Sequence, residues 1–184
     1  MLKAVLGFLA GLLVVAGAGY VMMPHMMFNE RVSPFGMEET IARIQHNIED
    51  SPELKAKGWN LSGLRNPAKA VQTDGGNVLP VMMIEVCSTK YSGPILKEDT
   101  VRFLSILMPC KISVYKKQDG KVYIGTMNAG LMGKMFGPLV GEVMGKVAED
   151  QKLFLEFDPS KPAPEIILPK APTGGAGGAA AGGC

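Results

Sequence analysis

The sequence predicts an α+β domain preceded by one N-terminal transmembrane helix. Three patterns lead to this prediction. An uninterrupted run without charged side chains extends from Ala4 to Met23, an amphipathic helical pattern covers residues 37–57, and a hairpin pattern covers residues 111–127. The chain of 184 residues has room for one such domain with appendages.

The N-terminal run has the length of a membrane span, because crossing the hydrocarbon core takes about 20 apolar residues in a helix. Lys3 lies before the run and predicts a short cytoplasmic N-terminus, so the remainder of the chain is exported. A cleaved signal peptide is the alternative, with small residues at 16–18 as its cleavage site. Both interpretations place the domain outside the cytoplasm.

Composition divides the chain into three parts. Residues 1–28 are the membrane anchor or signal peptide, residues 29–158 form the domain, and residues 159–184 form a tail rich in Pro, Gly and Ala that is predicted to be flexible. The formal charge is only +2 and no basic block occurs, so nucleic acid is not expected as a partner.

The first helix of the domain carries apolar residues at helical spacing, namely Met37, Ile41, Ile44 and Ile48. Pro52 is expected to kink or break it, and Gly58 to end it. Strands are predicted at residues 59–64, 78–87, 111–127 as a hairpin around Asp119-Gly120, and 153–157 as a closing strand.

A second helix is predicted over residues 131–148, with Pro138 kinking it or starting a new helix. Glycine recurs in it at every fourth position: Gly133, Gly137, Gly141 and Gly145. Such a stripe predicts close backbone packing, here against the domain's own sheet. The alternative is an exposed, Met-rich helix that docks on a partner or on the membrane surface.

The order of motifs resembles the family called domain of unknown function 302. The most specific motifs are Met108-Pro109-Cys110 and the segment "NAGLMGKMFG" at residues 128–137, and the resemblance covers about residues 30–150. It is closest to a proteobacterial, membrane-anchored branch. It implies an antiparallel sheet with packed helices, often as a dimer. Taken together with the N-terminal run and Lys3, it leads to the expectation of a bacterial inner-membrane protein with its domain in the periplasm. It implies no reaction.

Cys87 and Cys110 are the first candidates for a site. In an oxidising compartment the two thiols would form a structural disulfide or a redox-responsive pair, or they would remain reduced as small buried hydrophobes. Glu85 shares the strand face of Cys87, and Met108 precedes Cys110, so both are candidate binding residues.

The end of the apolar run supplies a second candidate site of soft ligands: Met22, Met23, His25, Met26 and Met27. Thioethers and imidazole suit copper as Cu(I), and Met with His also ligates haem iron. The alternative is that these residues simply extend the membrane helix.

No catalytic motif occurs, so an enzyme is not favoured. The leading hypothesis is a membrane-anchored periplasmic domain that binds a ligand, an envelope protein or a second copy of itself. The alternative is a carrier that uses thiol and Met ligands for metal, haem or electrons in envelope electron transfer or in sulfur and metal handling.

Overall fold

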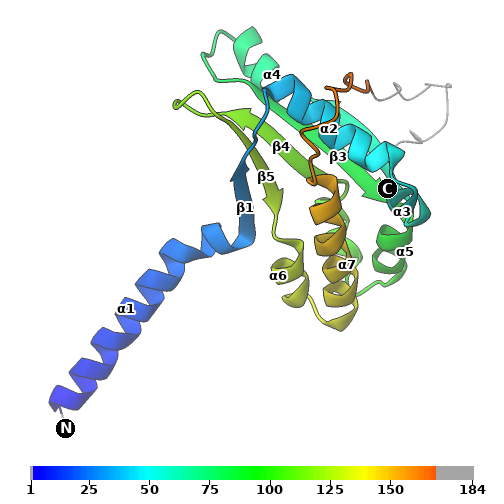
Figure 1. Cartoon of the computed structure of the whole chain (residues 1–184). Helices are drawn as coiled ribbons and strands as arrows, with labels where there is room; N and C mark the ends of the chain where they lie inside the picture. Colours follow the sequence, from blue (N-terminus) through cyan, green and yellow to red (C-terminus); the bar gives the residue numbers. More distant parts are fainter. Residues whose placement is uncertain (1, 169–184) are drawn as a thin grey trace.

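The computed structural model describes residues 2–168, without the side chains of residues 2–6 and 24. The domain consists of a five-stranded antiparallel sheet with helices packed on it, which confirms the predicted α+β class (Figure 1). The strand order is β1-β5-β4-β3-β2. The strands are β1 (Phe28–Val32), β2 (Trp59–Arg65), β3 (Val81–Ser88), β4 (Cys110–Lys116) and β5 (Val122–Met127).

The predicted hairpin is confirmed as β4 and β5, which pair in antiparallel register from Ile112↔Thr126 to Lys116↔Val122. Gly120 adopts a φ of 77° in the connecting turn, a conformation that glycine reaches without steric cost. The segments predicted at 59–64 and 78–87 are confirmed as β2 and β3.

Two helices replace the single one expected over residues 37–57. They are α2 (Met37–Asp50) and α3 (Pro52–Ala56), so Pro52 breaks the helix. The Ser51 hydroxyl accepts a hydrogen bond from the backbone N–H of Leu54 at 3.2 Å and thereby caps α3. Gly58 then ends the helix with a φ of 78°.

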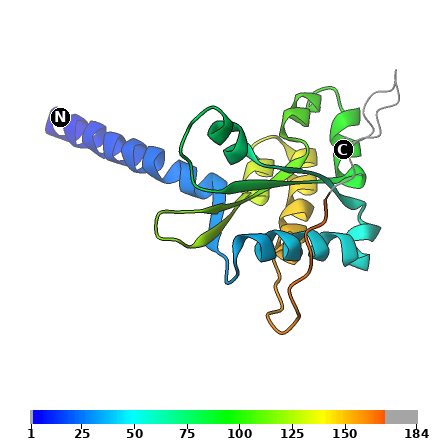
Figure 2. The same ribbon diagram turned by 90° about the horizontal axis from the view of Figure 1, so that it is seen from above.

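The core lies between the sheet and the helices α2 and α7 (Pro138–Phe154). The apolar stripe of α2 and one face of α7 pack against alternate residues of the central strands; the core includes Ile41, Ile44, Ile48, Ile84, Ile112, Ile124, Val140, Val143 and Val147. Figure 2 shows α2 on one side of the sheet. This packing is what amphipathic helices and alternating strands require.

The helix predicted over residues 131–148 is instead α6 (Ala129–Lys134) followed by α7. Pro138 starts α7 at its first turn, so of the two alternatives the new helix is correct. The predicted closing strand at 153–157 is wrong. Phe154 ends α7 and packs edge-on against Trp59, with 4.9 Å between ring centroids, and β1 occupies the sheet edge beside β5.

The remaining helices are α4 (Pro67–Thr73), α5 (Thr89–Lys97) and the 3-10 helix η1 (Arg102–Leu107). The last two lie between β3 and β4 along the chain and cover one end of the core, where Ile95 and Leu104 are buried.

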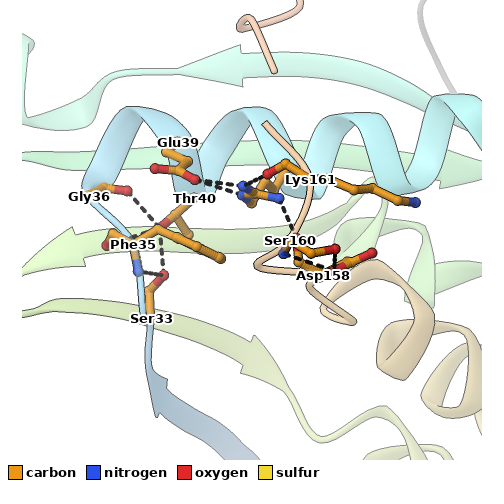
Figure 3. Close-up of polar contacts among 9 residues, drawn as sticks. Ser33, Phe35, Gly36, Glu39, Thr40, Asp158, Ser160 and Lys161 are labelled. Atoms are coloured by element: carbon orange, nitrogen blue, oxygen red, sulfur yellow. Dashed lines mark hydrogen bonds and ion pairs between the residues drawn. The ribbon is translucent and has the colours of Figure 1, made fainter. Parts of the chain in front are cut away.

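Residues 158–167, where the flexible tail was expected to begin, lie along α2. The Arg43 guanidinium donates to the carbonyls of Asp158 at 2.9 Å and Lys161 at 2.7 Å (Figure 3). The Gln45 side chain donates to the carbonyl of Ile167 at 2.7 Å and accepts from its N–H at 2.9 Å. Residues 169–184, including Cys184, are outside the described part.

Helix α1 (Leu2–Met27) leaves the domain on its own (Figures 1 and 2). Its end is attached through Asn128, whose side-chain amide donates to the carbonyl of Met26 at 2.9 Å and whose backbone N–H donates to that of Met27 at 2.8 Å. The predicted N-terminal transmembrane helix is not supported by the structure, because no helix within the described residues is long and apolar enough to cross a bilayer.

Candidate functional site

A small apolar cavity of about 50 Å³ lies at the end of the core where the sheet meets α5, η1, α6 and α7. Its lining is almost wholly apolar. Trp59 and Tyr91 contribute aromatic rings, and Val140, Val143 and Val147 contribute one face of α7. A cavity with so few polar partners is dry and suits an apolar guest.

Sulfur-bearing residues make up a large part of the rest of the lining. The sulfur-bearing residues are Cys87, Met108, Cys110, Met127, Met132 and Met144, and they come from strands, loops and helices far apart in sequence. Met side chains are flexible and polarizable, so such a lining adapts its shape to a guest. The predicted candidates Met108 and Cys110 therefore lie at one cavity, and Cys87 borders it near the end of β3.

Cys110 is a free thiol, partly buried at the start of β4. Burial raises the pKa of this thiol above its ordinary value, and the positive charge of Lys111 opposes the effect only in part. The thiol therefore stays protonated at neutral pH and contributes a neutral, weakly polar surface.

The predicted Cys87–Cys110 disulfide is wrong, because Cys110 is free. The register of the sheet explains the error. Val86 is the residue of β3 that pairs with Cys110, so Cys87 is one residue beyond that pair. Adjacent residues of a strand project to opposite faces, and a disulfide needs both Cβ atoms on the same side. Cys87 is buried and engaged in a different contact.

A buried carboxylate holds the aromatic wall of the cavity in place. Asp150 on α7 accepts from the Trp59 indole N–H at 2.7 Å and from the Lys57 ammonium at 2.6 Å. These hydrogen bonds, the one to Asp150 first, raise the pKa of Lys57, so the lysine stays charged. Tyr91 packs edge-on against Trp59 at 5.6 Å between centroids, and burial raises its pKa, with a hydrogen bond to Asp150 adding to the effect.

The sequence analysis did not predict this cluster of Asp150, Lys57, Trp59 and Tyr91. Asp150 follows Glu149 and precedes Gln151 and Lys152 in a polar stretch that resembles a solvated helix end. Only the position of Asp150 on the same face as Val143 and Val147, at helical spacing, separates it from its neighbours.

Glu85 is not part of the cavity. It projects from the opposite, open face of the sheet, as the register Glu85↔Lys111 requires, and pairs with Arg65 at 3.2 Å. Its role as a binding residue beside Cys110 is therefore not supported by the geometry.

The soft-ligand residues at the end of α1 are distributed around an exposed helix. Met22, Met23 and Met26 are exposed, whereas Met27 is half-buried. His25 lines a wide groove of about 720 Å³ on the open face of the sheet, together with Phe28 and Ile106. Among the described residues no cluster of three or more His, Cys, Asp or Glu side chains occurs that could hold a metal ion.

The groove and the cavity share a wall. Leu107, Cys110 and Met127 line both of them. Cys110 thus belongs to the wall that the core cavity and the groove on the open face of the sheet have in common.

The glycine stripe serves the contact between α6 and α7 and not, as predicted, the contact with the sheet. A Cβ on Gly133 would overlap the Cβ of Met144 and lie 3.0 Å from the Val140 carbonyl oxygen. Gly137 has a φ of 91° at the start of α7. Gly141 makes ordinary contacts and Gly145 has open space around it. Only Gly133, which lines the cavity, is required for close packing.

The profile of the family described as "Domain of unknown function DUF302" matches residues 29–156. A similar solved structure is the "Crystal structure of uncharacterized conserved protein DUF302 from Bacillus stearothermophilus", with 23% identity and a TM-score of 0.59 over 71% of this chain and 96% of that one. No curated protein matches the chain.

Proposed function

The chain belongs to the family Domain of unknown function DUF302, and we propose that it is a membrane-anchored domain that binds a small apolar ligand in the cavity beside Cys110. The observation that carries this proposal is the apolar, sulfur-lined cavity of about 50 Å³. Free space of this kind weakens a core, because its walls forgo packing contacts. A binding role accounts for keeping it.

The size of the cavity restricts the ligand. An engineered apolar cavity of about 150 Å³ holds benzene, and the cavity here, at about 50 Å³, has roughly a third of that volume. The ligand, or the part of it that enters, is therefore slimmer than an aromatic ring, such as the end of a hydrocarbon chain. Larger guests require that Met132 or Met144 change rotamer, which unbranched Met side chains do readily.

The anchor part of the proposal rests on the sequence, since no helix of the described residues meets the requirements for a bilayer span. The uncharged run Ala4–Met23 has the length of a bilayer span, and α1 covers it as one continuous helix. Large apolar side chains of this helix are exposed on the described stretch, among them Phe8, Leu13 and Val15. A bacterial inner membrane, with the domain in the periplasm, fits the position of Lys3 before the run.

Trp59 provides a direct test, because it is the only tryptophan of the chain and lines the cavity. Bromoethane is a small apolar probe whose bromine quenches indole fluorescence. We expect bromoethane to quench Trp59 with a saturable dependence on concentration, whereas bromide ion, which stays in water, has little effect because Trp59 is buried.

Two substitutions make this test specific. Val143→Phe places a larger side chain in the cavity and is expected to abolish the saturable quenching. Val71→Phe, on the exposed surface of α4, is the matched control and should behave like the unmodified chain. Equal, purely collisional quenching in all three proteins would contradict ligand binding in the cavity.

A second candidate function is the binding of Cu(I), favoured by the presence of one thiol and four thioethers in the same lining. Soft sulfur ligands suit Cu(I), and a bound metal would displace the Cys110 proton despite its raised pKa. The chain's own ligands would be Cys110 with Met108 and Met127. The cavity is too small for a haem.

Cu(I) titration under anaerobic conditions separates this candidate from the first. A carrier predicts an ultraviolet thiolate-to-copper band that reaches its maximum at one equivalent and is lost in Cys110→Ala. If the bromoethane response is retained and no copper band appears, only the binding of an apolar ligand remains as a candidate function.

A further inference from the structure

The end of the domain next to α1 carries a cluster of exposed, large apolar side chains. We call this cluster the apolar end; it consists of Phe28, Phe103, Ile106, Met135 and Leu139. Ile106 is 81% exposed, Met135 66% and Phe103 63%. Side chains of this size rarely gather on a soluble surface without a binding role.

A shared groove, one aromatic contact and neighbouring positions along the chain relate the members of the apolar end. Ile106 of η1 lines the same groove as Phe28 and His25. Phe103 packs edge-on against Phe136 in the turn between α6 and α7, with 6.3 Å between ring centroids. Met135 precedes Phe136 in this turn, and Leu139 lies in the first turn of α7. The surface is therefore formed jointly by β1, η1 and the α6–α7 turn.

The same surface adjoins the point where α1 leaves the domain. Phe28 directly follows α1, and Asn128, the N-cap of α6, holds the last carbonyls of α1 through two hydrogen bonds. In Figure 1, α1 points downward from the domain and the α6–α7 turn forms the lower end of the domain. If α1 spans a bilayer, this end of the domain lies at the bilayer surface.

The charges around the apolar end suit an interface with lipid headgroups. Lys134 precedes Met135 and Lys111 lines the groove beside Ile106; both are exposed, and neither appears among the ion pairs of the described residues. Arg102 is paired with Asp99, so this pair adds no net charge. Lysines at the rim of an apolar surface extend toward the headgroups while their stems remain on the apolar side.

From these observations we propose that the domain docks onto the bilayer through the apolar end, with Ile106, Phe103 and Met135 inserted at the level of the upper acyl chains. This inference rests on the anchor proposed above and adds a second, non-spanning contact with the membrane. It also brings η1 and α6 to the lipid, and these elements supply Leu104, Leu107 and Met132 to the cavity wall.

The proposal is tested by fluorescence of the full chain in vesicles of phosphatidylcholine and phosphatidylglycerol with brominated acyl chains. Tryptophan is introduced at Ile106→Trp or Met135→Trp, and at Val71→Trp on α4 as the control at the opposite end of the domain (Figure 1). All variants contain the buried Trp59, so the unmodified chain provides the baseline.

The docked arrangement predicts that Ile106→Trp and Met135→Trp emit at shorter wavelength in vesicles and lose about half or more of the added emission to brominated lipid, as for apolar side chains at the acyl boundary. Val71→Trp should remain unquenched. Flotation of each variant with unbrominated vesicles is measured in parallel.

Variants that float but show no quenching at positions 106 and 135 would overturn the docking while the anchor stands. A chain that does not float would overturn the anchor and the docking together. Neither result depends on the bromoethane response of Trp59, which tests the cavity alone.

Discussion

At the scale of single residues, Cys110 is the group with the most distinctive environment. It is a free thiol in the wall between an apolar cavity and an open groove. Burial disfavours its thiolate, and since the thiolate is the reactive form, the structure predicts a thiol of low reactivity.

This environment gives a pH prediction with a definite sign. An ordinary thiol is half ionised near pH 8.5, whereas burial raises the pKa of Cys110, so iodoacetamide should alkylate Cys110 in the folded chain more slowly than an ordinary thiol at that pH. The unfolded chain should react rapidly at pH 9, because it ionises at the ordinary value.

Because folding raises the pKa of Cys110, it also makes the stability of the fold depend on pH. The folded state retains the Cys110 proton at a pH where the unfolded state has lost it, so this contribution to stability is complete below the ordinary pKa and is lost as pH rises toward the folded pKa. Cys110→Ala should therefore reduce the alkaline fall in stability. A folded chain alkylated at the ordinary rate at pH 8 would contradict the burial of this thiol.

Asp150 is the second residue with a clear consequence. Asp150→Ala leaves the Trp59 indole N–H without its acceptor inside the core and is expected to destabilise the fold by about 1–3 kcal/mol. The expected loss is moderate because Lys57 is a third exposed and regains water.

The neighbouring Glu149→Ala is the control for Asp150→Ala, since among the described residues Glu149 makes only an exposed ion pair, with Lys152. Chemical denaturation monitored by Trp59 fluorescence measures both variants. Equal stabilities of the two would show that Asp150 does not hold the aromatic wall.

At the scale of elements, the contact between α6 and α7 gives a matched pair of substitutions. Gly133→Ala forces its new Cβ into Met144 and toward the Val140 carbonyl, so it should destabilise by about 1–3 kcal/mol. Gly145→Ala meets no neighbouring atom and should stabilise by up to about 1 kcal/mol through helix propensity. Thermal melts compare the two, and a stabilising Gly133→Ala would refute the close approach.

The segment along α2 gives the second prediction for an element. Gln45→Ala removes both hydrogen bonds to the backbone of Ile167 and should increase amide hydrogen exchange across residues 158–168 more than in the rest of the domain. Glu38→Ala, on the exposed side of the same helix, should leave this exchange unchanged. Exchange that rises equally throughout the domain in Gln45→Ala would argue against a locally held segment.

At the scale of the whole molecule, the sequence predicted features that depend on neighbouring residues. The hairpin around Gly120, the break at Pro52 and the start of α7 at Pro138 follow from local backbone chemistry. The apolar stripe of α2 follows from helical spacing.

Features that depend on distant residues could not be predicted in this way. The pairing of β1 with β5, the burial of Asp150 and the course of residues 158–167 join positions about 90 to 125 apart in sequence. The disulfide prediction failed for the same reason, because the pairing of Val86 with Cys110 was not visible in the spacing of the cysteines. The cavity arises from eight elements together, four strands and four helices, and has no local signature.

The whole molecule combines the helix α1, which we propose as an anchor, an apolar end beside it and a cavity whose walls come partly from the same elements as that end. This arrangement places the proposed ligand site close to the proposed membrane surface. It follows that the ligand and the bilayer are expected to act on the same part of the domain, namely η1, α6 and the start of α7.

The central claim is that the cavity admits an apolar guest, and crystals of the protein pressurised with xenon test it most directly, since dry apolar cavities take up xenon. The account predicts anomalous scattering from a xenon atom between Trp59, Met132 and Val143. Crystals that bind xenon elsewhere but contain none at this position, because methionine side chains fill the space, would contradict it.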